Sequence, residues 1–277
     1  MTSSNSFPIA LTIAGLDPSG EAGVLADART FAAFGLHPSA VITSLTFQNR
    51  ARVFGAVDQS ADTVRGQVMP LLEEYKVVCA KVGMLPTREV VTEVARLFRE
   101  LDLPSPVIDP VMIATSGRRL MDEEALDALI GELFPVAGLI TPNIPEAEKL
   151  AGISIASEGE MLQAAAIIRG LGARAVLVKG GHLLGAQASW LPSRPPDDPD
   201  QSNAVVIDVL DNEGVVTVFR ELRIEGAQLH GSGCILSTAI AAGLGKGMTL
   251  EDAVRAAKTF VWEALREASD RSSESNL

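Results

Sequence analysis

The chain has 277 residues, of which 47% are hydrophobic and 4% aromatic, and its formal net charge at pH 7 is −12. This length suits one large α/β domain, which we expect to cover residues 1–277. The acidic balance argues against general binding to nucleic acid or to anionic membranes. Phosphorylated small molecules stay possible as ligands, because backbone N–H groups, single lysines and a metal ion act locally.

Cysteine usage and hydropathy narrow the class further. Cys79 and Cys234 are the two cysteines, and they lie far apart without a metal-ligand pattern, so no disulfide framework is expected. Residues 1–6 lack the basic and apolar regions of a signal peptide, and no segment is long and apolar enough to span a bilayer. The sequence therefore predicts a soluble, cytoplasmic protein without a membrane partner.

The first half of the chain alternates between short aliphatic runs and amphipathic runs. The aliphatic runs predict strands at 9–15, 39–46, 77–83 and 106–109, and the amphipathic runs predict helices at 24–34, 62–73 and 90–101. Gly35 ends the first of these helices. Residues 53–58 predict a short edge strand that forms part of a flap over a pocket mouth.

The second half continues the alternation. It predicts strands at 138–141 and 175–179, and helices at 120–134, from 142–146 onward, at 160–171, at 234–244 and at 250–267. Residues 205–210 and 215–219 predict an antiparallel hairpin around a turn at 211–214. We expect residues 1–7 and 269–277 to fray, and the Pro-rich segment 186–203 to be a solvated loop insertion. The whole pattern indicates a mostly parallel sheet with helices on both faces.

The segment from Gly231 to Cys234 places two glycines and a serine directly before a predicted helix. Glycine permits a tight turn and a close approach to a ligand, and the first helical turn offers unpaired N–H groups at its positive end. Such a junction predicts an anion site of the kind that holds phosphate. Cys234 would lie in the first turn, where a thiol pKa tends to fall. On these residues alone, an ordinary loop-to-helix junction with a buried cysteine is equally compatible.

Polar groups follow almost every predicted strand, at the edge where open α/β sheets bind ligands. These positions carry Gly15, Asp17, Gln48, Asn49, Gly83, Met84, Asp109, Asn143 and Lys179. Gln48 carries an amide donor and acceptor that suit the edge of a heterocycle, although a polar turn residue is the alternative. Lys179 can reach a phosphate, although a solvated lysine at a strand end is the alternative.

Asp109, Asn143 and Glu146 supply oxygen atoms of the kind that hold Mg²⁺ directly or through water. Asn143 and Glu146 lie three residues apart at a helix start, and in isolation a helix N-cap paired with its acid is the favoured interpretation. Asp27 follows Gly23 by four residues and can point back over the sheet edge. An exposed helical acid is the alternative for Asp27.

Taken jointly, these residues resemble the hydroxymethylpyrimidine/phosphomethylpyrimidine kinases of thiamine biosynthesis, which have a ribokinase-like fold. The resemblance runs from about Ile9 to Glu267 and rests on blocks at 11–15, 17–20, 47–49, 81–85, 108–112, 140–143 with Glu146, 178–182 and 230–234. Cys234 stands where sugar kinases of this superfamily carry an aspartate, which indicates the pyrimidine and pyridoxal kinase branch. The resemblance implies a central, mostly parallel sheet flanked by helices on both faces.

The resemblance also implies roles for the site residues. For the substrate it implies Gln48 as the hydrogen-bonding partner of an aminopyrimidine, assisted by Gly15, Asp27, Met84 and Val111. For the co-substrate ATP and its Mg²⁺ it implies Asp109, Asn143 and Glu146, with Lys179 neutralising the transferring group. It further implies an anion hole made by Gly231, Ser232, Gly233 and Cys234, with Cys234 as the candidate for activating the substrate hydroxyl.

The predicted activity is phosphorylation of 4-amino-5-hydroxymethyl-2-methylpyrimidine and then of its monophosphate, by a homodimer. A pyridoxal or pyridoxine kinase of the same superfamily is the nearest alternative, because both substrates are aromatic heterocycles bearing a hydroxymethyl group. A non-catalytic pyrimidine-binding protein is disfavoured by retention of the phosphate-site residues. Glu21 and Phe47 depart from the family pattern beside the substrate and can narrow or shift the choice of substrate.

Overall fold

The computed structural model describes residues 7–49, 52–114, 117–181, 205–224 and 231–274. The expectations for residues 1–6, for the Pro-rich segment 186–203 and for 275–277 lie outside the described residues.

Within the described residues, nine strands form one sheet in the order β3-β2-β1-β4-β5-β6-β7-β8-β9. Their bounds are β1 Phe7–Leu16, β2 His37–Gln48, β3 Val53–Asp58, β4 Tyr75–Val82, β5 Val107–Ile108, β6 Leu139–Ile140, β7 Ala175–Lys179, β8 Val205–Asn212 and β9 Val215–Leu222. The six central strands, β2, β1, β4, β5, β6 and β7, pair in parallel. At one edge β3 pairs antiparallel with β2, and at the other edge β8 and β9 are added antiparallel. The predicted mostly parallel sheet is confirmed, and so is the edge strand at 53–58.

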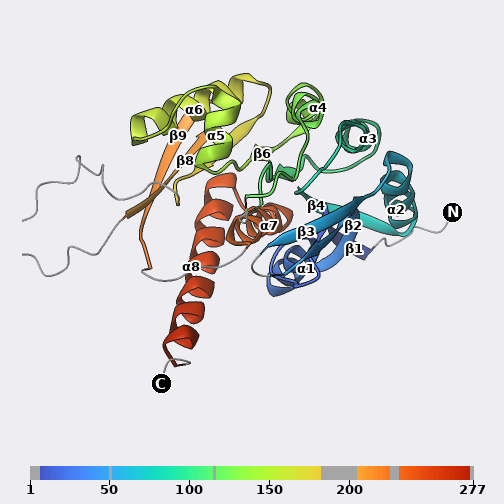
Figure 1. Ribbon diagram of the computed structural model, residues 1–277, viewed down its shortest axis with the longest axis horizontal. Coiled ribbons are helices and arrows are strands. Elements are labelled where there is room, and N and C mark those ends of the chain that lie inside the picture. Colours follow the sequence, from blue (N-terminus) through green and yellow to red (C-terminus); the bar gives the residue numbers. More distant parts are fainter. Residues whose placement is uncertain (1–6, 50–51, 115–116, 182–204, 225–230, 275–277) are drawn as a thin grey trace, which may run out of the picture.

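Helices cover both faces of this sheet (Figure 1). One face carries α1 (Gly23–Ala33), α7 (Ser232–Gly245) and α8 (Leu250–Glu274), and the other carries α2 (Ala61–Glu74), α3 (Arg88–Glu100), α4 (Glu123–Ala128), α5 (Ile144–Ala151) and α6 (Glu158–Gly170). Alternate residues of β1 supply the two cores, with Ala10 packing towards the layer of α1, α7 and α8, and Ile9 and Leu11 packing towards the opposite layer. No helix within the described ranges is both long and apolar enough to cross a membrane.

Three local predictions differ from the structure. The expected helix at 120–134 begins only at Glu123, because Asp122 caps it by accepting a hydrogen bond from Ala125 N–H at 2.6 Å. That helix then passes into a π-helical turn at Leu129–Leu133 and a 3-10 turn at Phe134–Val136, where Pro135 ends the regular pattern.

The hairpin turn and the last helix also differ. The turn consists of Glu213 and Gly214, both with positive φ (53° and 90°), so Asp211 and Asn212 belong to β8. Helix α8 continues to Glu274, beyond the expected end near Glu267.

Candidate active site

A cavity of about 1600 Å³ opens along the carboxyl edge of the parallel strands. It extends from the β2–β3 hairpin, past the start of α7, to β9 and α8. Twelve of the predicted site residues line it, namely Gly15, Gln48, Met84, Asp109, Val111, Asn143, Glu146, Lys179, Gly231, Ser232, Gly233 and Cys234. The fold thus brings together residues separated by more than 200 positions in the chain, from Gly15 to Cys234.

The loop between β1 and α1 forms part of the cavity wall and is built around Asp17. This carboxylate is 2% exposed and accepts hydrogen bonds from Ser19 N–H at 2.8 Å and from Ala22 N–H at 3.0 Å. Gly23 completes the loop with φ +60°, and a Cβ there would clash with the Gly15 carbonyl oxygen. Asp17 therefore shapes the loop, a role that its position at a strand end did not reveal.

The predicted anion loop has the geometry that its glycines require. Gly231 is the N-cap of α7 with φ +75°, and a Cβ at this position would clash with the Glu21 carbonyl oxygen. A glycine N-cap offers no side chain to the N–H groups of the first turn. These N–H groups therefore stay available to a ligand at the positive end of the helix.

Lys179 lies at the positive end of α7, where Asp109 holds it. The Lys179 Nζ is 2.8 Å from Asp109 Oδ1, and a Cβ on Gly233 would lie 3.2 Å from the same Nζ. Burial lowers the pKa of Lys179, but the charges of Asp109 and Glu146 outweigh it and raise that pKa above its usual range. The pKa of Asp109 is lowered, because the lysine charges outweigh burial, which acts to raise it. Both side chains therefore remain charged.

Asn143 and Glu146 form the capping box that was the favoured interpretation of the pair in isolation. Asn143 Oδ1 accepts a hydrogen bond from Glu146 N–H at 2.9 Å, and Glu146 Oε2 accepts one from Asn143 N–H at 2.9 Å. The capping role does not remove either residue from the cavity wall. Burial raises the pKa of Glu146 to about 7, with Lys179 lowering it and the charge of Asp109 raising it further.

The residues predicted to hold Mg²⁺ offer a sparse donor set. Within the described ranges, no group of three or more His, Cys, Asp or Glu side chains is arranged to hold a metal ion. Asp109 and Glu146 nevertheless provide two like-charged carboxylates whose repulsion adds to the raised pKa of Glu146. Because Mg²⁺ is commonly held by one or two carboxylates together with phosphates and water, this donor set fits an ion delivered with a nucleotide.

The expectation of a lowered thiol pKa at Cys234 is wrong. Although Cys234 as a residue is only partly buried, loss of hydration raises the pKa of its thiol to about 12. Lys81 and the Gly23 N–H lower the pKa, but Asp109 and Asp27 raise it. The helix N-terminus therefore does not outweigh burial and two neighbouring carboxylates, and the thiol is protonated and donates a hydrogen bond to Asp109.

Asp27 does not line the cavity, unlike the rest of the predicted substrate-binding set. Its carboxylate is fully buried beneath the site and lies 2.9 Å from the Nζ of Lys81. Thr12 and Thr238 donate the remaining hydrogen bonds to it, at 2.6 and 2.7 Å. Lys81 itself lines the cavity. A lysine within an otherwise aliphatic predicted strand was the sequence feature that could have indicated this buried pair.

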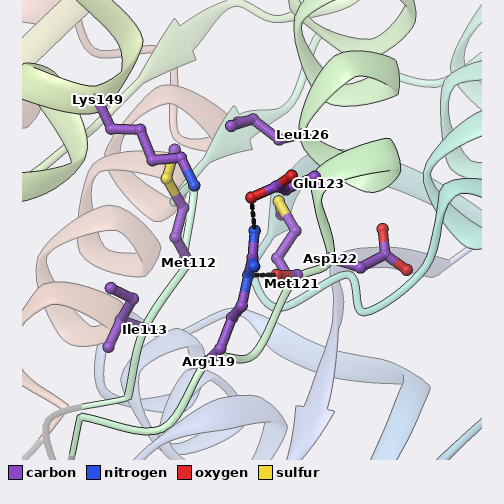
Figure 2. Close-up of a pocket in the computed structure, with 8 residues that line it drawn as sticks. All are labelled: Met112, Ile113, Arg119, Met121, Asp122, Glu123, Leu126 and Lys149. Atoms are coloured by element: carbon purple, nitrogen blue, oxygen red, sulfur yellow. Dashed lines mark hydrogen bonds and ion pairs between the residues drawn. The ribbon is translucent and has the colours of Figure 1, made fainter.

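A smaller cavity of about 260 Å³ adjoins the main one and shares Met112, Ile113 and Lys149 with it. Figure 2 shows Arg119 in this cavity, turned towards Glu123 and the Met121 carbonyl oxygen. Arg119 lies 3.0 Å from Glu123 and 2.9 Å from that carbonyl. This cavity is therefore a side chamber of the main site whose arginine is already paired.

A mostly parallel sheet with a lysine, two carboxylates and a glycine-bordered helix N-terminus at its carboxyl edge defines a phosphotransferase with a ribokinase-like fold. A sequence model of the phosphomethylpyrimidine kinase family matches residues 17–276. The chain belongs to this family and is a kinase.

Relatives of known sequence and structure agree with this family. A hydroxymethylpyrimidine/phosphomethylpyrimidine kinase of Rhizobium meliloti is 42% identical over 264 residues, covering 95% of this chain and 92% of the relative. The crystal structure of a phosphomethylpyrimidine kinase from Clostridium difficile 630 superposes with a TM-score of 0.76 at 34% identity, covering 94% of this chain and 99% of that one.

Pyridoxal kinases are structural relatives as well. An ADP complex of the Bacillus subtilis pyridoxal kinase has a TM-score of 0.77 at 32% identity, covering 92% of this chain and 90% of that one. The predicted fold class and the predicted family are therefore confirmed.

Proposed function

We propose that the protein transfers a phosphoryl group from ATP to the hydroxymethyl group of 4-amino-5-hydroxymethyl-2-methylpyrimidine, and then a second one to the resulting monophosphate, in thiamine biosynthesis. The observation that carries this proposal is the position of Lys179 between Asp109 and the first turn of α7, inside the cavity. Phosphoryl transfer depends mostly on positioning and on neutralising negative charge. A fixed cation beside free helix N–H groups serves both needs.

The pyrimidine is expected at the β1–β2 end of the cavity. Gln48 ends β2 beside a register shift in the pairing with β3, and it lines the cavity with Val111. Met84 packs close to Gly15, where a Cβ would lie 3.0 Å from its sulfur, and Thr43 holds the Met84 carbonyl with a hydrogen bond of 2.6 Å. The Gln48 amide would pair with the polar edge of the ring, and Met84 and Gly15 would contact its face.

The nucleotide is expected to approach from the other end. There the cavity wall comes from β8, β9 and α8. Its apolar side chains are Val206, Leu222, Val261, Trp262 and Leu265, beside the ion-paired Asp208, Glu221 and Lys258. An adenine ring bound there would leave its phosphates directed towards Lys179 and the start of α7. This arrangement supports ATP as the co-substrate.

Each polar group then has a distinct part in the transfer. When bound with the nucleotide, Mg²⁺ would neutralise phosphate charge, and Asp109 and Glu146 are the side chains that would hold it. Lys179 would neutralise the moving phosphoryl group, and the N–H groups of the first turn of α7 would bind its oxygens. Because the Cys234 thiol is protonated in this environment, the contribution that we assign to Cys234 is its backbone N–H.

A pyridoxal-type kinase is the second candidate, and the likeness to solved pyridoxal kinases favours it. Initial rates of ADP release with the pyrimidine alcohol, its monophosphate and pyridoxal, at equal concentrations, separate the two. We expect the two pyrimidines to be preferred. A marked preference for pyridoxal would overturn the substrate assignment while leaving the kinase assignment intact.

We also infer a homodimer in the cytoplasm. Leu45, Phe47 and Val57 are exposed apolar side chains on the β2–β3 edge, and a second copy of the chain would cover them. Both cysteines are free, which suits a reducing compartment. Light scattering on the purified protein tests the dimer, and a monomeric mass at micromolar concentration would contradict it.

A further inference from the structure

Lys81 and Asp27 form an ion pair whose two side chains are both 0% exposed. The Lys81 Nζ lies 2.9 Å from Asp27 Oδ2 and 3.1 Å from Asp27 Oδ1. Such a buried pair adds little to the stability of the fold, because the free-energy cost of desolvating two charges offsets most of their attraction. Its position directly beneath the phosphate-binding end of the cavity indicates a role in the reaction.

The pair connects three elements that surround the anion loop. Asp27 comes from α1 and Lys81 from β4, and Thr238 comes from α7, one turn after Cys234. The Thr238 hydroxyl lies 2.7 Å from Asp27 Oδ1 and also 2.7 Å from the Cys234 carbonyl oxygen. The carboxylate is therefore tied to the helical turn whose N–H groups face the cavity.

The lysine of the pair is the member next to the cavity. Lys81 is among the residues around the cavity and Asp27 is not, but the Lys81 side chain is 0% exposed, so its charge lies beneath the cavity wall and acts on the site without contact. Gly83 leaves the room that the ammonium needs, because a Cβ there would lie 2.7 Å from Lys81 Nζ. A charge in such a buried place is screened much less than one at the surface.

We propose that Lys81 and Asp27 are positioning residues for phosphoryl transfer. The pair fixes the first turn of α7 through Thr238, and it presents a positive charge to an arriving polyphosphate. The proposal rests on the proposed function only for the identity of the neutral substrate. It predicts that the pair favours anionic ligands without contributing to binding of a neutral one.

Calorimetric titration of the full-length protein with inorganic tripolyphosphate and with the neutral pyrimidine alcohol tests this. The double substitution Lys81→Gln with Asp27→Asn removes both charges and keeps hydrogen-bonding side chains. We expect it to weaken tripolyphosphate binding about tenfold while the alcohol changes by less than about twofold. The matched control is Arg65→Gln with Glu93→Gln, which neutralises an ion pair between α2 and α3 away from the cavity and is expected to leave both affinities unchanged.

Wild-type affinity for both ligands in a folded double variant, or an equal loss for both, would overturn the proposal. If the double variant does not fold, Thr238→Val tests the proposal instead, because this substitution removes only the hydrogen bond that links Asp27 to α7. A loss of severalfold for tripolyphosphate alone is expected there, and unchanged affinity would refute the link. If the wild-type protein binds tripolyphosphate but not the alcohol, the proposed substrate is wrong. The tripolyphosphate affinities of the variants would still test the role of the ion pair.

Discussion

The ammonium of Lys179 lies 2.8 Å from Asp109 Oδ1, at the point of the cavity where α7 begins. The positive end of a helix repels a lysine, so the carboxylate is what holds this cation in place. A phosphate entering the cavity would meet Lys179 and the free N–H groups of α7 together. This relationship supports the proposal that Lys179 acts in the transfer step and that the ring binds at the other end of the cavity.

Replacing Lys179 by methionine should slow the transfer step. We expect kcat to fall by about 10²–10³-fold, because one fixed charge that stabilises the transferring group is lost. The KM for the pyrimidine should change by less than about threefold, since we propose that the ring binds at the other end of the cavity. Lys76→Met, at an exposed position of β4, is the control for loss of a lysine. Steady-state kinetics measure both parameters, and an increase in KM with normal kcat would contradict the assignment.

Replacing Gln48 by alanine should have the opposite signature. We expect the KM for the pyrimidine alcohol to rise about tenfold, equivalent to about 1.4 kcal/mol, because the hydrogen bonds to the ring are lost. The kcat at saturating substrate should stay within about threefold of wild type, and the KM for ATP serves as the internal control. A fall in kcat with unchanged KM would place Gln48 in the transfer step instead.

Replacing Gly231 by alanine should abolish function for a steric reason. The φ of +75° costs alanine about 1–2 kcal/mol, and its Cβ would in addition clash with the Glu21 carbonyl oxygen. Gly35→Ala is the matched control, because φ there is +76° but nothing lies within 4 Å of the added Cβ. We expect a small loss of stability in the Gly35 variant, a larger loss in the Gly231 variant because of the added clash, and loss of activity in the Gly231 variant alone. Equal activity in the two would show that the close approach at Gly231 is not required.

The regular elements could be predicted because each depends on its own residues. The aliphatic runs that form β1, β4 and β7 are buried on both faces and read as continuous apolar segments. The start of the helix after Asp122 was harder to predict, because this capping aspartate lies inside a run whose amphipathic period continues through it. The exact turn at Glu213 and Gly214 depends on strand pairing, which the local pattern does not encode.

The sequence predicted most of the residues that line the site, but it did not predict all of the contacts between them. Strand ends converge in any parallel sheet, so Gln48, Asp109 and Lys179 were expected at one edge. The partner of Asp27 was missed, because Lys81 is 54 residues away and only the fold places the two together. The thiol pKa of Cys234 was misjudged, because burial and neighbouring carboxylates belong to the tertiary structure.

The buried carboxyl of Glu146 predicts a pH-dependent stability in the absence of nucleotide and metal. Its pKa is about 7 in the folded chain, against an ordinary value of 4.5, so the folded chain binds this proton more tightly than the unfolded chain. The contribution of Glu146 to the free energy of unfolding therefore falls as the pH rises from about 4.5 to about 7.

Glu146→Gln should remove this contribution while keeping an oxygen for the capping box. We expect the variant to be more stable than wild type at pH 8 by on the order of 1–3 kcal/mol, with the difference shrinking towards pH 4.5. Urea unfolding at several pH values, with EDTA present, measures the difference. A difference that does not depend on pH, or one that grows as the pH falls, would contradict a raised pKa.

Phosphorus NMR of a reaction containing purified protein, ATP, Mg²⁺ and the pyrimidine alcohol is the most direct test of two successive phosphoryl transfers. We expect a phosphomonoester signal to appear first and then to be replaced by the two signals of a diphosphate, with ADP formed in step. Release of ADP and inorganic phosphate without any pyrimidine phosphate, or no turnover at all, would contradict the proposed function.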